Sequence, residues 1–272
     1  MLRKWIGLAA GAGAATLTLT GVSQAAPQPW QIGLQPAASP VMSSIEDFHR
    51  FLLYIIVAVC ILVFALLVWI IIRYNERRNP VPGKVTHNTT LEVVWTIVPV
   101  IILVVIAIPS FKLLYYEADI PAPDLTIKAI GKQWFWTYQY PTSGNFQFDS
   151  LGLSDIAAAK KGEPRLLGVD NVVVVPVNRV VKVETTGADV IHSWAVPAFG
   201  VKMDAIPGRI NETWFKATAE GTYYGECSEL CGARHAYMPI EVKVVSQNAF
   251  NAWLATARKK FAAIDNEHVA AK

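Results

Sequence analysis

The stretch "FLLYIIVAVCILVFALLVWIII", residues 51–72, runs for 22 residues without a charged side chain. A second stretch, "VVWTIVPVIILVVIAIPSF" at 93–111, is uncharged over 19 residues. A helix needs about 20 apolar residues to cross the hydrocarbon core of a bilayer. A helix in a soluble core is seldom apolar on all sides over such a length. The two stretches therefore predict a transmembrane hairpin with helices at 46–75 and 91–116.

Two prolines, Pro99 and Pro109, lie inside the second apolar stretch. Proline removes a helical hydrogen bond and kinks the helix, which is tolerated in a membrane where neighbouring helices satisfy the freed carbonyl groups. The prolines therefore indicate a helix that packs within a larger membrane assembly.

The linker between the two stretches, which we place at 76–90, orients the hairpin. Basic residues outnumber acidic ones around it: the basic residues are Arg73, Arg77, Arg78 and Lys84, and the acidic ones are Glu76 and Glu92. Lys and Arg close to the ends of membrane helices mark the cytoplasmic side. The segment before the hairpin and everything after residue 116 are therefore expected outside the cytoplasm.

The chain begins "MLRKWIGLAAGAGAATLTLTGVSQAAPQPW", residues 1–30, with two basic residues, a small apolar run and small residues near position 25. This pattern is typical of a secretory signal peptide, here 1–25, followed by an external segment at 26–45. A first membrane anchor is the alternative interpretation. Export would place the remaining chain in an oxidising compartment.

Residues 117–245 are long enough for one domain with its own core. Strand patterns occur at 124–140, where Trp134, Trp136, Tyr138 and Tyr140 share one face, and at 171–186, 212–226 and 238–245. Short strands separated by Pro and Gly predict a β-sandwich or barrel.

The pattern becomes helical at 246–272. Apolar residues recur there at helical spacing after Ser246, a suitable N-cap, and predict an amphipathic helix with a loose tail at 262–272. Residues 117–245 carry 15 acidic and 12 basic residues. This weak acidic excess argues against a nucleic-acid partner.

The segment "GECSELCGARHAYM", 225–238, places potential metal ligands close together. The spacing is C-x3-C-x3-H-x2-M, and His192 lies upstream. A disulfide between Cys227 and Cys231 would close a very small loop and leave the histidine and methionine unexplained. Two cysteines and two histidines also form a zinc set.

Copper is the third interpretation of this segment, because thiolate, imidazole and thioether are ligands that copper prefers. A mononuclear blue-copper site uses a single cysteine, so the second thiolate suits two sulfur-bridged copper ions. A backbone carbonyl in the loop, with Glu229 at its centre, could complete the set. Spacing alone leaves copper and zinc open.

A family resemblance rests on three segments: "GKQWFWTYQYP" (131–141), "DVIHSWAVPAFGVKMDAIPGRINETWF" (189–215) and "GTYYGECSELCGARHAYMPIEV" (221–242). They resemble subunit 2 of haem–copper cytochrome c oxidase, of the alphaproteobacterial and mitochondrial kind. The resemblance covers about 45–260, including the hairpin. Related quinol oxidase subunits lack the copper ligands present here.

The resemblance implies a two-helix transmembrane hairpin, an all-β cupredoxin-like domain and a C-terminal amphipathic helix. It also implies a binuclear copper A centre held by His192, Cys227, Cys231, His235, Met238 and the carbonyl of Glu229. The Glu229 carboxylate would bind Mg²⁺ or Mn²⁺ shared with subunit 1, since hard cations prefer oxygen ligands. Asp204 and Arg209 would contact subunit 1 near the haem propionates. Taken without the resemblance, they are an ordinary salt-bridged loop.

In the same family the first tryptophan of the "QWFWTY" segment, here Trp134, receives electrons from cytochrome c. On pattern alone it is a core aromatic. Asp170 and Asp189 match carboxylates that dock the lysines of cytochrome c. Gln139 and Ala188 stand where acidic residues occur in relatives, so the resemblance implies a thinner acidic patch and slower or less salt-sensitive association.

Glu92 has two compatible roles. Thr89-x-x-Glu92 reads as a capping box, with Thr89 as the cap of the second membrane helix. In the family this glutamate marks the cytoplasmic start of a proton path into subunit 1.

The sequence as a whole indicates subunit 2 of cytochrome c oxidase in a bacterial inner membrane, with both termini and the copper domain on the periplasmic side. It would accept electrons from cytochrome c and pass them to haem in subunit 1, where oxygen is reduced and protons are pumped. Subunits 1 and 3 and lipid are the other expected partners. No C-x-x-C-H motif is present, so no covalent haem is expected. A copper storage or assembly protein and a nitrous oxide-reducing enzyme are the alternatives.

Overall fold

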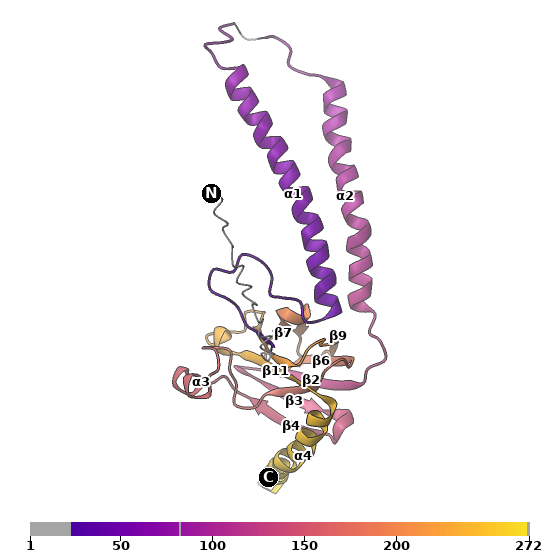
Figure 1. Cartoon of the computed structure of the whole chain (residues 1–272), viewed down its shortest axis with the longest axis vertical. Coiled ribbons are helices and arrows are strands. Elements are labelled where there is room, and N and C mark those ends of the chain that lie inside the picture. Colours follow the sequence, from indigo (N-terminus) through magenta and orange to yellow (C-terminus); the bar gives the residue numbers. More distant parts are fainter. Residues whose placement is uncertain (1–22, 82, 271–272) are drawn as a thin grey trace, which may run out of the picture.

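Two long helices rise from one end of a β-sandwich in the computed structural model, which describes residues 23–81 and 83–270 (Figure 1). Helix α1 spans Pro40–Arg73 and α2 spans Thr89–Ala118. The expected signal peptide, 1–25, lies outside the described residues except for β1 (Ser23–Ala25), which pairs with β10 (Gly221–Cys227). Helix α1 begins within the predicted external segment 26–45 and extends into the first apolar stretch.

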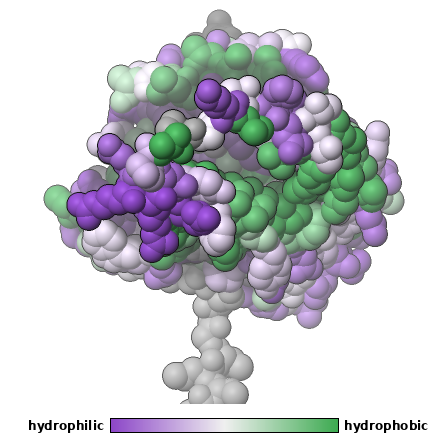
Figure 2. Space-filling model, turned by 90° about the horizontal axis from the view of Figure 1, so that it is seen from above, coloured by the Kyte–Doolittle hydropathy of each residue, from purple (hydrophilic) through white to green (hydrophobic). Residues whose placement is uncertain are grey.

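Both helices are long and apolar enough to cross a membrane, and no part of the most apolar window of either is buried within the described chain. Large apolar side chains such as Phe64 and Ile71, each 69% exposed, project from them. Seen from above, hydrophobic residues cover much of the molecule (Figure 2). Such a surface needs lipid or other subunits around it, as expected for a membrane hairpin.

The start of α2 differs from the predicted capping box. Asn88, one residue before Thr89, is the N-cap, and its side chain accepts a hydrogen bond from the N–H of Leu91. The Glu92 carboxylate reaches back and accepts from the N–H of Asn88 at 3.3 Å. Asparagine is as good a cap as threonine, so the helix gains its cap one residue earlier than predicted.

The domain consists of two packed sheets, as predicted. The first has the order β5-β11-β10-β7-β8, and its further strands are β5 (Val173–Pro176), β7 (His192–Val196), β8 (Val201–Ala205) and β11 (Pro239–Val245). The second has the order β4-β3-β2-β6-β9, formed by β2 (Leu125–Lys132), β3 (Phe135–Tyr140), β4 (Phe146–Ser150), β6 (Val181–Gly187) and β9 (Asn211–Phe215). Short helices η1 (Pro141–Ser143), η2 (Pro197–Phe199), η3 (His235–Tyr237) and α3 (Asp155–Lys161) fill the connections.

The single strand predicted at 124–140 is wrong. The chain turns back at Gln133 and Trp134, and β2 and β3 pair as an antiparallel hairpin in which Lys132 faces Phe135. Trp136, Tyr138 and Tyr140 are buried in the core, whereas Trp134 in the turn is only partly buried. The turn contains none of the Gly, Pro, Asn or Asp residues that usually mark such a reversal, so the sequence did not reveal it.

The end of the chain also differs from its prediction. Helix α4 spans Gln247–Ala270, so the segment predicted as a loose tail is largely helical. Ser246 does cap the helix, because its hydroxyl accepts from the N–H of Ala249. Once a helix is nucleated, each further residue costs little, and the alanine-rich tail propagates it.

The hairpin is fixed to the sandwich at the base of α1. The Ser39 hydroxyl donates to the carbonyl of Phe199 at 2.7 Å, and the N–H of Ala38 donates to Ala198 at 2.8 Å. Tyr116 at the base of α2 packs edge-on against Trp214 of β9. These contacts, of which the one at Ser39 is buried, hold the domain against the membrane end of the helices.

Close approach of β10 to β7 brings Cys227 and His192 together. The two strands pair only at Glu226↔Ala195 and Cys227↔Trp194. A Cβ atom at Gly225 would lie 1.9 Å from the carbonyl oxygen of Ala195, so only glycine allows this distance. The result brings the end of β10, with Cys227, beside the start of β7, with His192.

Glu241 in β11 should make stability depend on pH. Its side chain is 4% exposed, and burial raises the pKa of its carboxyl to about 7, although the N–H of Val169 donates to it. The folded state then keeps a proton that the unfolded chain loses between about pH 4.5 and about pH 7, so stability falls as pH rises through this window. Glu241→Gln should remove that part of the slope, at most about 1.4 kcal/mol per pH unit.

Denaturant unfolding of the detergent-solubilised chain from pH 4 to pH 8 measures this slope. Glu226→Gln, at an exposed position of the neighbouring strand, is the control. Equal slopes for the wild type and Glu241→Gln would contradict the assignment.

Candidate metal centre

Two buried thiols form the middle of the site. Cys227 ends β10, and Cys231 lies in the loop that follows; each is 3% exposed. Their sulfur atoms are 3.9 Å apart, far beyond the roughly 2.05 Å of a disulfide bond. Both cysteines are therefore free thiols, and the disulfide interpretation is not what the structure shows.

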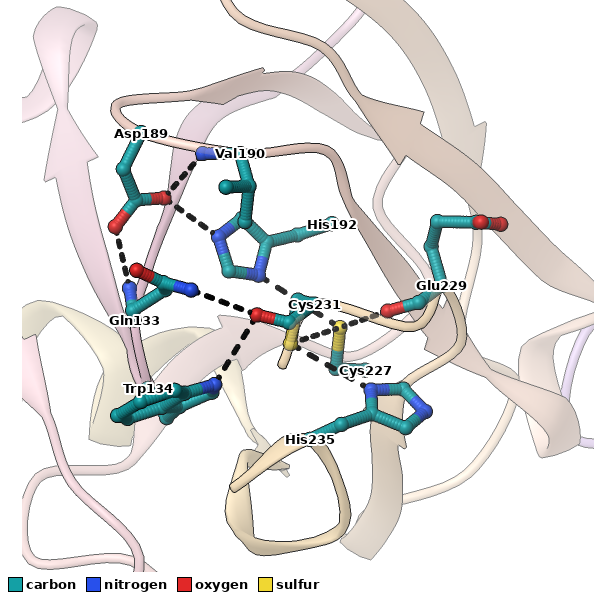
Figure 3. Close-up of polar contacts among 9 residues, drawn as sticks. All are labelled: Gln133, Trp134, Asp189, Val190, His192, Cys227, Glu229, Cys231 and His235. Atoms are coloured by element: carbon teal, nitrogen blue, oxygen red, sulfur yellow. Dashed lines mark hydrogen bonds and ion pairs between the residues drawn. The ribbon is translucent and has the colours of Figure 1, made fainter. Parts of the chain in front are cut away.

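A histidine faces each thiol (Figure 3). The Nδ1 atom of His192 lies 3.9 Å from the sulfur of Cys227, and Nδ1 of His235 lies 3.6 Å from the sulfur of Cys231. Ligand atoms of His192, Cys227 and Cys231 all lie within 4.8 Å of one another. His192, at the first position of β7, is completely buried, whereas His235 begins η3 and is partly exposed.

Glu229 and Met238 complete the neighbourhood. The carbonyl oxygen of Glu229 is 3.4 Å from the Cys227 sulfur, and its carboxylate points away from the thiols (Figure 3). Met238 is 1% exposed, and its carbonyl accepts a hydrogen bond from the N–H of Cys227 at 3.0 Å. His192, Cys227 and Cys231 thus form a buried group, with His235 and the carbonyl of Glu229 beside the sulfurs and the buried Met238 joined to Cys227 through its backbone.

The pKa values of the two thiols are shifted in opposite directions. Burial raises the pKa of Cys227, but hydrogen bonds with His192 and with nearby backbone groups outweigh it and bring the pKa down to about 7. Burial and the adjacent Cys227 together raise the pKa of Cys231 to about 12. Two thiolates this close repel, so a bound cation is what allows both to ionise.

Asp189 fixes the orientation of His192. Its Oδ1 atom accepts from Nε2 of His192 at 2.8 Å and from the N–H of Val190 at 2.7 Å. Its Oδ2 atom accepts from the N–H of Gln133 at 2.7 Å. With Nε2–H donated to a carboxylate, the lone pair of Nδ1 is directed toward the thiols, the usual arrangement of a metal-binding histidine. Although burial raises the pKa of Asp189, these hydrogen bonds hold it below its ordinary value.

Trp134 lies beside the Cys231 loop, and its indole Nε1–H donates to the carbonyl of Cys231 at 3.2 Å. Gln133 donates its side-chain amide to the same carbonyl at 2.9 Å. No local pattern marks Gln133, because its partners lie 56 and 98 positions away.

The other predicted residues lie outside this cluster. The exposed Asp170 accepts from the backbone N–H groups of Leu151 and Asn171, each at 2.7 Å. Asn171 also donates to the backbone carbonyl of Asp149, an exposed residue that sequence reasoning did not single out, whose carboxylate accepts from the hydroxyl of Thr137. The alternation of Phe146 and Phe148 around Gln147 is the pattern that could have located this strand.

Asp204 lies in β8, opposite Ser193 in register. Its carboxylate is 3.5 Å from the ammonium of Lys202, so within the described residues it pairs with Lys202 and not with Arg209, which is exposed in the next turn. Glu92 lies at the start of α2, which places it away from the metal cluster, near the far end of the hairpin (Figure 1).

The donor set determines which metals fit. Two thiols, two imidazoles and a buried thioether-bearing residue are soft or borderline donors, which suit copper better than a hard cation, and the backbone carbonyl is the single hard donor beside them. A structural zinc site has four ligands, and the methionine and carbonyl are in excess for it. The residues present therefore fit a copper centre.

Two sequence families match the chain. The family described as "Cytochrome C oxidase subunit II, periplasmic domain" matches residues 125–245, and "Cytochrome C oxidase subunit II, transmembrane domain" matches 27–113. Among individual proteins, the probable cytochrome c oxidase subunit 2 of Rickettsia bellii is 50% identical over 90% of this chain and 91% of its own. Cytochrome c oxidase subunit 2 of Cereibacter sphaeroides is 47% identical over 85% of this chain and 82% of its own.

A solved structure supports the same comparison. The periplasmic domain of subunit II of cytochrome oxidase from Bradyrhizobium japonicum is 60% identical, with a TM-score of 0.50. It covers 53% of this chain and 99% of the other, which corresponds to the sandwich without the hairpin. The fold predicted from the sequence, a membrane hairpin followed by a cupredoxin-like sandwich and a C-terminal helix, is confirmed.

Gly131 of β2 provides a test of how tightly His192 is held. A Cβ atom at this position would lie 2.7 Å from two ring carbons of His192, which is buried and held by Asp189. Gly131→Ala should displace the imidazole and weaken metal binding about tenfold or more. Metal titration in competition with a chelator measures the effect. The control is Gly33→Ala, where a Cβ meets no atom within 4 Å; wild-type affinity in Gly131→Ala would show that the ring is not constrained by β2.

Proposed function

Because the chain belongs to the cytochrome c oxidase subunit II family, we propose which of its residues bind copper, accept electrons, dock the donor and contact subunit 1. The family is the electron-accepting subunit of a haem–copper terminal oxidase, an oxidoreductase that reduces oxygen to water. Its members carry a copper A centre, and the His192, Cys227 and Cys231 group of this chain fits one.

The proposed copper ligands are six: His192, Cys227, the carbonyl of Glu229, Cys231, His235 and Met238. One observation carries the proposal: two free buried thiols lie 3.9 Å apart, and a histidine Nδ1 faces each of them. When bound, the binuclear centre supplies a site that takes up and releases one electron at a time.

The protein contributes a dry and rigid surrounding to this centre. His192, Cys227, Cys231 and Met238 are each no more than 3% exposed, so water is kept from the thiols. Strand β7 and strand β10 carry His192 and Cys227, and a sheet holds side chains more firmly than a loop. A site that is already in place needs little rearrangement when its charge changes.

Trp134 is the proposed point where electrons from cytochrome c arrive. It is partly buried, and its indole N–H bonds directly to the carbonyl of Cys231. A partly exposed aromatic ring is thereby linked to a metal ligand through one hydrogen bond and the backbone of Cys231.

The proposed docking surface for cytochrome c uses the exposed carboxylates of Asp170 and Asp189. Both oxygens of Asp189 already accept hydrogen bonds within the chain. Gln139 pairs with Gln147 and adds no charge. Association with a basic cytochrome should therefore depend on few carboxylates and show a modest salt dependence.

The outward carboxylate of Glu229 is the proposed ligand of Mg²⁺ or Mn²⁺ shared with subunit 1. It points away from the thiols, so the backbone and the side chain of Glu229 would serve different ions (Figure 3). Asp204 and Arg209 are the proposed contacts with subunit 1 near the haem. The exposed Arg209 is available for such a contact.

Glu92 is the proposed cytoplasmic start of a proton path. It lies in the first turn of α2, and its Oε1 bond to the N–H of Asn88 is long, at 3.3 Å. A weakly held carboxylate at a membrane boundary can accept and release protons.

We further propose a bacterial inner membrane location, with the sandwich and both termini on the periplasmic side. The basic linker between α1 and α2 supports this orientation. Subunits 1 and 3 and membrane lipid would cover the exposed apolar faces of the helices.

Electron paramagnetic resonance of the copper-loaded full chain tests the proposal directly. The expected result is a hyperfine pattern of one electron shared by two copper nuclei. A pattern from a single copper nucleus would instead favour a copper storage or assembly protein and overturn the assignment.

Met238→Leu tests the weakest proposed ligand. Leucine has nearly the same volume as methionine, so the buried site should keep its shape and its copper content. Loss of the thioether should shift the reduction potential and slow electron transfer from cytochrome c. Potentiometry and stopped-flow kinetics measure the two effects, with Met203→Leu on β8 as the control. Wild-type potential and rate in Met238→Leu would remove Met238 from the ligand set.

A further inference from the structure

Gln133, in the turn between β2 and β3, bonds to both ligand-bearing arms of the site. We propose that Gln133 is a positioning residue. It holds the loop that carries Cys231 at a fixed distance from the loop that carries Asp189 and leads into His192. The expected effect on copper rests on the proposed function. The contacts on which the positioning role rests are hydrogen bonds within this chain.

The first contact is made by the backbone. The N–H of Gln133 donates to Oδ2 of Asp189 at 2.7 Å, and Oδ1 of the same carboxylate accepts from His192 at 2.8 Å. The Asp189 carboxylate is thus held at both oxygens. Gln133 acts on His192 through it, since a fixed carboxylate fixes the imidazole plane.

The second contact is made by the side chain. Nε2 of Gln133 donates to the carbonyl of Cys231 at 2.9 Å, and Trp134 donates to the same oxygen at 3.2 Å. A carbonyl has two lone pairs, and these two donors occupy both. The backbone of Cys231 is therefore fixed just where it carries a metal-binding sulfur.

Although Gln133 is exposed, its side chain lies close to the Cys231 loop. Gly232 has a φ of +119°, and a Cβ atom there would lie 3.1 Å from Nε2 of Gln133 and 3.1 Å from the ring of Trp134. On the other side, a Cβ at Gly131 would lie 2.7 Å from the His192 ring. The β2–β3 turn therefore lies close to both the Cys231 loop and His192. Glycine at positions 131 and 232 makes these short distances possible.

The sheet by itself does not fix this spacing. Strands β7 and β10 share only two register pairs, and Cys231 lies four residues beyond the last of them. Figure 3 shows Gln133 on the side of the cluster where the Asp189 loop and the Cys231 carbonyl meet. Gln133 bridges them where the strand pairing has ended.

Two variants separate the parts of this bridge. Gln133→Met keeps the length and the backbone N–H but removes the amide donor, and Gln133→Glu keeps the shape while placing an acceptor against the Cys231 carbonyl. Gln139→Met is the matched control. Gln139 lies in β3 of the same β2–β3 hairpin, but its side chain bonds to Gln147 of β4 and not to the metal site. All are made in the full chain in detergent.

The first measurement is hydrogen–deuterium exchange of residues 228–238 in the metal-free chain. Both Gln133 variants should exchange faster there, and Gln139→Met should match the wild type. The second is copper: release to a chelator should be about 10- to 100-fold faster in both Gln133 variants, with a shifted near-infrared absorption band.

A purely structural role would lower the melting temperature and leave the band and the release rate unchanged, and that result would overturn the proposal. Unchanged exchange in both Gln133 variants would overturn it as well. If Gln133→Met does not fold, Gln133→Glu alone decides. If the wild type binds no copper while the exchange difference persists, the copper function fails and the positioning role stands.

Discussion

The close approach of two free thiols in a buried pocket is the constraint on which the site depends. Sulfur atoms 3.9 Å apart cannot both carry a negative charge in a dry environment without a cation between or beside them. Burial and the neighbouring Cys227 keep Cys231 protonated, with a pKa of about 12. Without metal Cys231 therefore keeps its proton, and both thiols ionise together only when metal replaces the protons.

This constraint explains why glycines occur where backbone segments approach one another closely around the site. Gly225 lets β10 approach β7, and Gly131 and Gly232 let the β2–β3 turn approach both ligand arms. Each glycine removes a side chain from a place where two segments must touch. The aromatic core of Trp136, Trp194 and Tyr138 then fills the remaining space beneath the site, with Trp194 donating to the hydroxyl of Tyr138.

Local patterns predicted those parts of the molecule that local chemistry determines. The uncharged stretches predicted the transmembrane hairpin. The C-x3-C-x3-H-x2-M spacing predicted that Cys227, Cys231, His235 and Met238 lie close together. His192 was recognised as an upstream histidine, the methionine favoured copper over zinc, and the family resemblance then decided between the two metals. The turn at Gln133 was missed because it lacks turn-forming residues, and β7 was missed because both of its faces are buried and its residues do not alternate.

Long-range contacts account for what the sequence could not reveal. Asp189 was predicted as a docking carboxylate, yet its oxygens are bonded to Gln133, Val190 and His192. It therefore connects the surface where a basic protein would bind to a ligand of the metal. If Asp189 docks a basic partner as proposed, a charge approaching it would act on its hydrogen bond to His192, and docking and the proposed metal site would be coupled through one carboxylate. Such coupling depends on the register of strands that are far apart in sequence, and no local pattern encodes it.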